Sequence, residues 1–151
     1  MSDLKSILLA EDNAEDIELT MEALSQRNLA NEVVVVRDGV QALDYLYCRE
    51  EFKTRERGNP AVILLDIKMP KVSGLEVLRK IKADEKLKMI PVVILTSSRE
   101  ESDLVESYKL GVNAYIVKPV NFNEFIEAVK HLGMFWAFLN ERPPGCVKKL
   151  N

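Results

Sequence analysis

Residues 62–66 read VILLD, which is four apolar side chains followed by an aspartate. Three other stretches have a similar form: ILLAED at 7–12, VVILT at 92–96 and YIVK at 115–118. Apolar runs this short are typical of central strands in a parallel sheet that is buried on both faces. Each run ends on a side chain that can bind a phosphate or a divalent cation.

Strand-like runs alternate with helical patterns along the chain. We expect strands at 5–10, 32–36, 61–65, 91–95 and 113–117, and helices near 14–28, 39–48, 74–83, 98–110 and 121–139. Five βα units in succession predict an α/β fold with a parallel sheet and right-handed crossovers. Ligands of such sheets bind just beyond the carboxyl ends of the strands. The polar residues that end the runs are therefore expected to lie together.

Each predicted helix begins with a capping residue that is followed three positions later by an acid or an amide. The pairs are Asn13/Asp16, Asp38/Gln41, Ser73/Glu76, Ser98/Glu101 and Asn121/Glu124. A capping side chain accepts a hydrogen bond from an unpaired N–H group of the first helical turn. Gly111 stands where the fourth helix is expected to end.

Bulk composition indicates one soluble domain. A length of 151 residues suits a single core, and 47% hydrophobic residues are ordinary for a globular protein. The net charge of −3 argues against a nucleic-acid-binding protein. The chain has neither a signal-peptide pattern nor an apolar stretch of ~18 residues, so we expect a cytoplasmic location and no membrane contact.

Two stretches depart from the βα rhythm. Residues 49–60 are dense in charge and exceed the usual connection of ~2–6 residues. A solvated loop is the favoured interpretation, with a partner-docking loop as the alternative. The residues after Asn140 are too few for a second domain, which gives a domain over 1–140 and a C-terminal tail over 141–151.

The polar strand ends resemble those of the CheY-like receiver domain of two-component response regulators. The matching pieces are LLAED at 8–12, LLDIKMPKVSG at 64–74, ILTSS at 94–98 and YIVKP at 115–119. The similarity covers about residues 5–139, with the elements in the right order and spacing. The long loop before the third strand and the lack of an output domain resemble single-domain regulators that are paired with bacterial phytochrome kinases.

The resemblance implies a doubly wound, flavodoxin-like sheet of five parallel strands in the order 2-1-3-4-5. It implies that a sensor histidine kinase, in the narrower match a bacterial phytochrome, transfers a phosphoryl group to Asp66. The protein would then be no enzyme with a separate substrate, although it would assist its own phosphorylation and dephosphorylation. The message would pass to a downstream protein that the sequence does not identify.

The resemblance further implies a Mg²⁺ site. Asp12, Asp66 and the backbone carbonyl of Lys68 would bind the cation directly, and Glu11 would act through a bound water. Neighbouring carboxylates repel one another and raise each other's pKa values, and a divalent cation removes this repulsion. Mg²⁺ prefers such hard oxygen ligands. Asp66 then stays ionised and can attack phosphorus as a carboxylate nucleophile.

Three more residues receive roles from the resemblance. Thr96 and Lys118 would contact the phosphoryl group, and Thr96 and Tyr115 would form the switch. Thr96 would move toward the phosphoryl group, and Tyr115 would turn inward into the vacated space. The lysine ammonium acts on a phosphate as a compact positive charge.

The last predicted helix has one apolar stripe that suits a core face. Met134, Phe135 and Phe138 fall largely on its other side. Apolar side chains outside a core face often mark a contact surface. This pattern predicts a homodimer contact or a docking site, with coverage by the C-terminal tail as the alternative.

Three rival functions fit less well. A haloacid-dehalogenase-type phosphatase requires a second acid two residues after its nucleophile, where this chain has Lys68. A nucleotide or flavin binder requires a glycine-rich turn after the first strand, where this chain has EDNA at 11–14. A receiver that binds partners without phosphorylation is disfavoured because every residue expected of the site is present.

Overall fold

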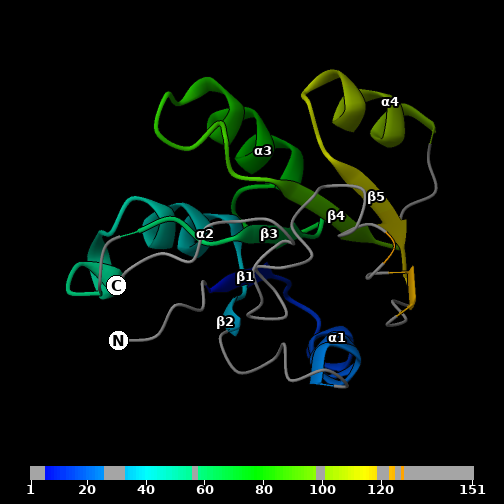
Figure 1. Ribbon diagram of the computed structural model, residues 1–151, viewed down its shortest axis with the longest axis horizontal. Helices are drawn as coiled ribbons and strands as arrows, with labels where there is room; N and C mark the ends of the chain where they lie inside the picture. Colours follow the sequence, from blue (N-terminus) through cyan, green and yellow to red (C-terminus); the bar gives the residue numbers. More distant parts are fainter. Residues whose placement is uncertain are drawn as a thin grey trace, which may run out of the picture.

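The computed structural model describes residues 6–25, 33–55, 58–97 and 101–118, together with Asn123, Glu124 and Glu127. The elements are β1 (Ile7–Ala10), α1 (Ala14–Ser25), β2 (Val33–Val36), α2 (Gly39–Leu46), η2 (Glu50–Phe52), β3 (Val62–Leu65), α3 (Gly74–Ala83), β4 (Val92–Thr96), α4 (Glu101–Lys109) and β5 (Ala114–Val117). All strand pairs are parallel, in the order β2-β1-β3-β4-β5 (Figure 1). The predicted doubly wound fold is confirmed.

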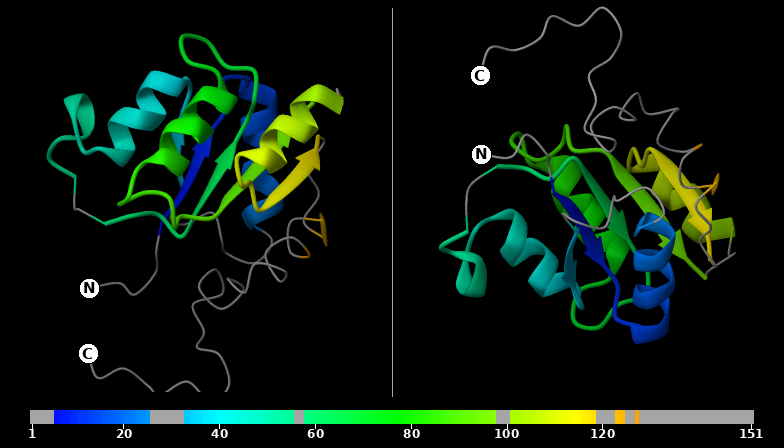
Figure 2. Two further views of the ribbon diagram at one scale, coloured as in Figure 1. Left: turned by 90° about the horizontal axis from the view of Figure 1, so that it is seen from above. Right: turned by 60° about the horizontal axis from the view of Figure 1, so that its bottom comes forward.

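The sheet separates two hydrophobic cores because successive side chains of a strand point to opposite faces. One core joins β1, β3 and β4 to α2 and α3 through Leu8, Ile63, Leu65, Ile94, Leu43, Leu46, Val77, Leu78 and Ile81. The other joins the same strands to α1 through Ile7, Leu9, Leu64, Val93, Leu95, Leu24, Ile17 and Met21. Figures 1 and 2 show α1 on one side of the sheet and α2, α3 and α4 on the other. Burial on both faces explains why the strands are apolar throughout.

Three of the five predicted helix caps lie in the described residues, and all three are formed. The backbone amides of Asp16, Gln41 and Glu76 donate to the side chains of Asn13, Asp38 and Ser73, at 2.9, 2.7 and 3.3 Å. Ser98 and Asn121, which begin the other two pairs, fall outside the described residues. The observed caps fix where the first three helices begin.

Two helices end in left-handed turns. Gly111 has a φ of 93° two residues after the end of α4, as the sequence predicts for a terminating glycine. Helix α2 ends at Leu46, two residues earlier than expected, because Cys48 adopts a φ of 54°. The Arg49 amide then donates to the Asp44 carbonyl at 2.9 Å, which closes the turn. A cysteine gives no sequence signal for such a turn.

The charge-dense stretch 49–60 is folded onto α2 rather than being wholly solvated. Its η2 turn brings Phe52 edge-on to Tyr45, with ring centroids 5.2 Å apart. The Arg55 guanidinium lies 3.9 Å from the centroid of the Tyr45 ring, and its Nε donates to the Tyr45 carbonyl at 2.8 Å. These contacts stabilise the segment by aromatic and cation–π packing.

Most of the last predicted helix lies outside the described residues, and so does the C-terminal tail. Met134, Phe135 and Phe138 belong to that part, so their proposed contact surface remains a prediction. Among the described helices, none combines the length and the apolar character that a membrane crossing requires.

Gly74 lets the start of α3 pack directly on the residue that ends β3. A Cβ at this position would lie 2.0 Å from the Asp66 carbonyl oxygen. The Gly74 amide also donates to the Ile67 carbonyl at 2.7 Å, which ties the two backbones together. Only glycine fits this approach, so Gly74 fixes the position of the segment that carries Asp66.

We predict that Gly74→Ala destabilises the protein by about 2–3 kcal/mol, because the backbone overlap must be relieved by movement of one segment. Helix propensity alone would favour alanine by about 1 kcal/mol. Chemical denaturation measures the difference, and Lys80→Ala on the exposed side of α3 is the matched control. A Gly74→Ala variant as stable as the wild type would contradict the packing described here.

Candidate functional site

Backbone pairing continues beyond the ends of the strands and holds three functional residues at one edge of the sheet. The Glu11 amide donates to the last carbonyl of β2 at 2.9 Å, and the Asp66 amide to the last carbonyl of β1 at 3.1 Å. The Lys118 amide donates to the Thr96 carbonyl at 2.8 Å. Since these bonds fix the backbone, the positions of the three side chains follow from the strand register.

Three carboxylates form a cluster at this edge. Glu11, Asp12 and Asp66 each have an oxygen within 4.8 Å of the others. The side chains of Glu11 and Asp66 are 3% and 8% exposed, whereas Asp12 is exposed. Closely spaced carboxylate oxygens with one open side suit a hard divalent cation that keeps some of its waters. The three carboxylates predicted to hold a metal could therefore hold one, whereas the predicted role of the Lys68 carbonyl stays a prediction.

The Lys118 ammonium lies among carboxylates. Its Nζ is 2.5 Å from Glu11 Oε1, 2.8 Å from Asp16 Oδ2 and 3.4 Å from Asp66 Oδ2. Burial would lower the pKa of Lys118, but the hydrogen bonds that Lys118 donates to Asp16 and Glu11 and the charge of Asp66 outweigh it and raise that pKa. The ammonium is therefore a permanent positive charge beside Asp66.

Burial raises the pKa of Glu11 to about 7, although its hydrogen bonds with Lys118 and with the Asn13 amide oppose the rise. The nearby charge of Asp66 adds to the increase. The Glu11 carboxylate is thus costly to keep ionised without further positive charge. A divalent cation at the cluster would supply that charge.

Thr96 and Tyr115 lie on the same face of the sheet. Thr96 ends β4 and is fully buried, and it pairs with Val117 in the strand register. Tyr115 pairs with Ile94, two residues before Thr96, and packs against the core beneath α2 and α3. The two residues are thus diagonal neighbours on adjacent strands. Lys68 is exposed in the segment that follows Asp66.

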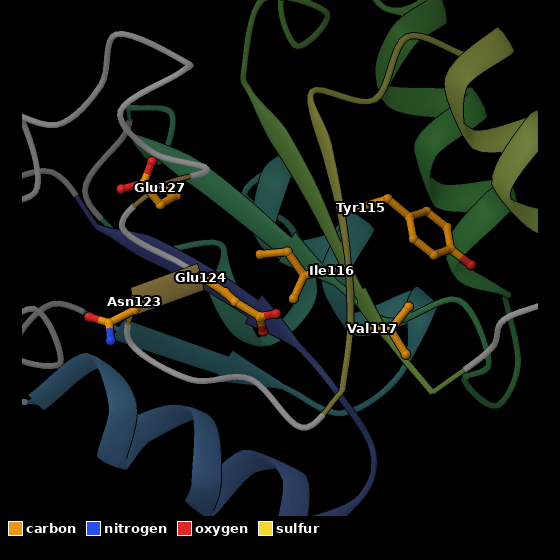
Figure 3. Close-up of a pocket in the computed structure, with 6 residues that line it drawn as sticks. All are labelled: Tyr115, Ile116, Val117, Asn123, Glu124 and Glu127. Atoms are coloured by element: carbon orange, nitrogen blue, oxygen red, sulfur yellow. The ribbon is translucent and has the colours of Figure 1, made fainter.

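A cavity of about 550 Å³ lies beside β5, and its described lining does not include the carboxylate cluster. The described lining residues are Tyr115, Ile116, Val117, Asn123, Glu124 and Glu127. Figure 3 shows the Tyr115 ring and the Ile116 side chain on opposite sides of the strand. The Tyr115 ring points toward the helices of its own face.

Asp16 is the contact that sequence reasoning missed. Its backbone role in the cap with Asn13 was predicted, but its carboxylate was given no part in the site. The signal that was available is its spacing: Asp16 follows Asp12 by four residues, and residues four apart share one face of a helix. Acids of the first helical turn are common for other reasons, which makes this signal weak.

Comparison with known proteins agrees with this geometry. The family model described as "Response regulator receiver domain" matches residues 7–130. Response regulator Rcp1 from Synechocystis sp. is 40% identical over 132 residues, which cover 87% of this chain and 88% of Rcp1. Its Mn²⁺-bound crystal structure superimposes with a TM-score of 0.73 over 88% of this chain and 94% of that one.

Two further solved structures are similar. The bacteriophytochrome response regulator RtBRR has 63% identity and a TM-score of 0.82, covering 94% of this chain and 86% of its own. The phosphorylated cyanobacterial phytochrome response regulator RcpA has 46% identity and a TM-score of 0.73, covering 88% of this chain and 94% of its own. By sequence and by structure, the chain belongs to the response regulator receiver domain family.

Proposed function

We propose that this protein is a phospho-accepting response regulator in which Asp66 receives a phosphoryl group from a sensor histidine kinase. The observation that carries the proposal is the position of Asp66 at a strand end, where its carboxylate lies near the oxygens of Glu11 and Asp12 and 3.4 Å from the ammonium of Lys118. A carboxylate nucleophile needs positive charge nearby, because the carboxylate and the approaching phosphate are both negative and repel each other. This site provides one such charge and the ligands for a second.

In the proposed step, a carboxylate oxygen of Asp66 forms a bond to phosphorus and becomes an acyl phosphate. The bond between phosphorus and the donor's imidazole nitrogen breaks, and that nitrogen keeps the electron pair. Phosphoryl transfer requires mainly positioning and charge neutralisation from the protein. Lys118 supplies charge, and the buried Thr96 hydroxyl supplies a directed donor. The protein thereby assists its own modification and has no separate substrate.

The proposed cofactor is Mg²⁺, held by Asp12 and Asp66, by the backbone carbonyl of Lys68 and through water by Glu11. When bound, the cation neutralises charge on the carboxylates and on the phosphoryl oxygens. The acid cluster and the Mn²⁺-bound state of Rcp1 support a divalent cation at this position.

The proposed output is a change of packing on the sheet face that Thr96 and Tyr115 share. A phosphoryl group adds negative charge and strong acceptors, which attract nearby donors such as the Thr96 hydroxyl. Movement of Thr96 would free space for Tyr115, which lies two register positions away. The surface formed by α4 and β5 would then differ between the phosphorylated and the unphosphorylated protein.

The proposed kinase partner is a bacterial phytochrome, by similarity to RtBRR and to the phytochrome regulator RcpA. We propose that the receiver domain spans 1–140, which contains the matched range 7–130, and that 141–151 form a tail. A homodimer through Met134, Phe135 and Phe138 remains part of the proposal, as does an unidentified downstream protein partner.

Incubation with acetyl phosphate and Mg²⁺ is expected to add one phosphoryl group to the wild-type protein, measured by intact mass. Asp66→Asn should gain none, because an amide is not a nucleophile toward phosphorus. The matched control is Asp44→Asn, whose carboxylate on α2 pairs with Arg49 and should not affect the reaction. Equal mass gain by Asp66→Asn and the wild type would place the modification elsewhere.

Metal affinity is expected to depend on the exposed carboxylate of the cluster. Asp12→Asn should weaken Mg²⁺ binding by roughly 10- to 100-fold, as measured by titration calorimetry, because one anionic ligand is lost. Glu15→Gln removes a charge three residues away that is not part of the cluster, and it should bind Mg²⁺ as the wild type does. If both variants lose Mg²⁺ affinity equally, Asp12 acts on the cation only through its long-range negative charge and not as a ligand.

Thr96→Ala is expected to accept the phosphoryl group, because the nucleophile, the metal ligands and Lys118 all remain. It should lose the switch, since no hydroxyl moves toward the phosphoryl oxygens. The Tyr115 ring resonances in NMR spectra should therefore shift on phosphorylation of the wild type and of Thr96→Ser, but not of Thr96→Ala. An identical Tyr115 shift in all three proteins would refute the proposed link.

A further inference from the structure

Lys118 is held by a carboxylate that lies outside the metal cluster. Its three contacts with Glu11, Asp16 and Asp66 match the three N–H donors of an ammonium. Glu11 and Asp66 also belong to the cluster with Asp12, whereas Asp16 does not. The Lys118–Asp16 distance of 2.8 Å is shorter than the 3.4 Å that separates Lys118 from Asp66.

Asp16 reaches Lys118 from the first turn of α1. Its backbone amide is satisfied by the Asn13 side chain at 2.9 Å, so its own carboxylate is not needed for the cap. The Asp16 side chain is 29% exposed, compared with 8% for Lys118. The pair thus connects a partly exposed helix start to a buried ammonium that is 102 residues away in sequence.

Occupation of the acid cluster by a divalent cation would change which partners Lys118 keeps. Oxygens of Glu11 and Asp66 would be drawn toward the cation, and Asp66 would lose its carboxylate charge on phosphorylation. The bonds from Lys118 to these two residues would weaken. Asp16 would be the carboxylate contact that both events leave in place.

We propose that Asp16 is a positioning residue that holds the Lys118 ammonium beside Asp66 during phosphoryl transfer. This inference rests on the proposed function of Asp66. A long lysine side chain without this anchor would sample other orientations, and misplacement of a charge-stabilising group slows a reaction steeply. Removal of the Asp16 charge would by itself reduce repulsion of the incoming phosphate, so a slower reaction of an Asp16 variant would report the loss of positioning.

The simpler explanation is that Asp16 stabilises the α1 N-terminus, as acids of the first helical turn do. Glu15 separates the two roles, because it occupies the same turn and is exposed. A helix-terminus effect would appear in both Asp16→Ala and Glu15→Ala. An effect through Lys118 would appear only in Asp16→Ala.

The experiment measures the rate of phosphorylation at saturating acetyl phosphate and Mg²⁺, together with the Mg²⁺ dissociation constant. The proteins are the wild type, Asp16→Ala, Glu15→Ala, Lys118→Ala and the double variant Asp16→Ala/Lys118→Ala. We expect Asp16→Ala to be roughly 10-fold slower, with a Mg²⁺ constant within about twofold of the wild type. Glu15→Ala should retain the full rate. In the Lys118→Ala background, loss of Asp16 should change the rate less than about twofold.

An unchanged or faster reaction of Asp16→Ala overturns the inference, and so does an equal loss in the presence and absence of Lys118. A parallel loss of Mg²⁺ affinity would make Asp16 part of the metal site and also overturns it. If the wild type accepts no phosphoryl group, the proposed function itself fails. The two failures are thereby distinguished within one set of measurements.

Discussion

The arrangement of the site depends on the gathering of like charges at one buried edge. Glu11, Asp12, Asp16 and Asp66 surround or adjoin a single ammonium, that of Lys118. Carboxylates at this spacing repel one another, and burial adds to the cost of their ionisation, as the raised pKa of Glu11 indicates. Strand register and close backbone packing must hold these groups together. The same excess of negative charge makes this edge of the sheet suitable for a divalent cation.

In the proposed switch, the sheet would transmit phosphorylation at this edge to the surrounding helices. Thr96 and Tyr115 share the face covered by α2, α3 and α4, and the other face belongs to α1. Phosphorylation of Asp66 would therefore act on one layer of the fold through Thr96, while Lys118 connects the same event to α1 through Asp16. The site thus contacts both helical layers, one through Thr96 and the other through Asp16.

The apolar pattern was sufficient to predict the strands, and the family resemblance supplied their order and the expected site residues. Apolar runs such as 62–65 fit strands that are buried on both faces, and the polar residue that follows marks the strand end. Contacts between side chains that are distant in sequence were harder to predict. From sequence, Asp16 was explained by its place in the cap with Asn13, and only its weak four-residue spacing from Asp12 pointed toward the site. Likewise, Phe52 and Arg55 pack on Tyr45 within a stretch whose charge suggested solvent.

The central claim is that the carboxylate of Asp66 itself becomes phosphorylated, and borohydride reduction tests it most directly. Borohydride converts an aspartyl phosphate to homoserine and leaves a free aspartate or a phosphoserine unchanged. After treatment with acetyl phosphate and Mg²⁺, tandem mass spectrometry should find homoserine at position 66. Aspartate retained at position 66 in protein that has gained a phosphoryl group would contradict the account.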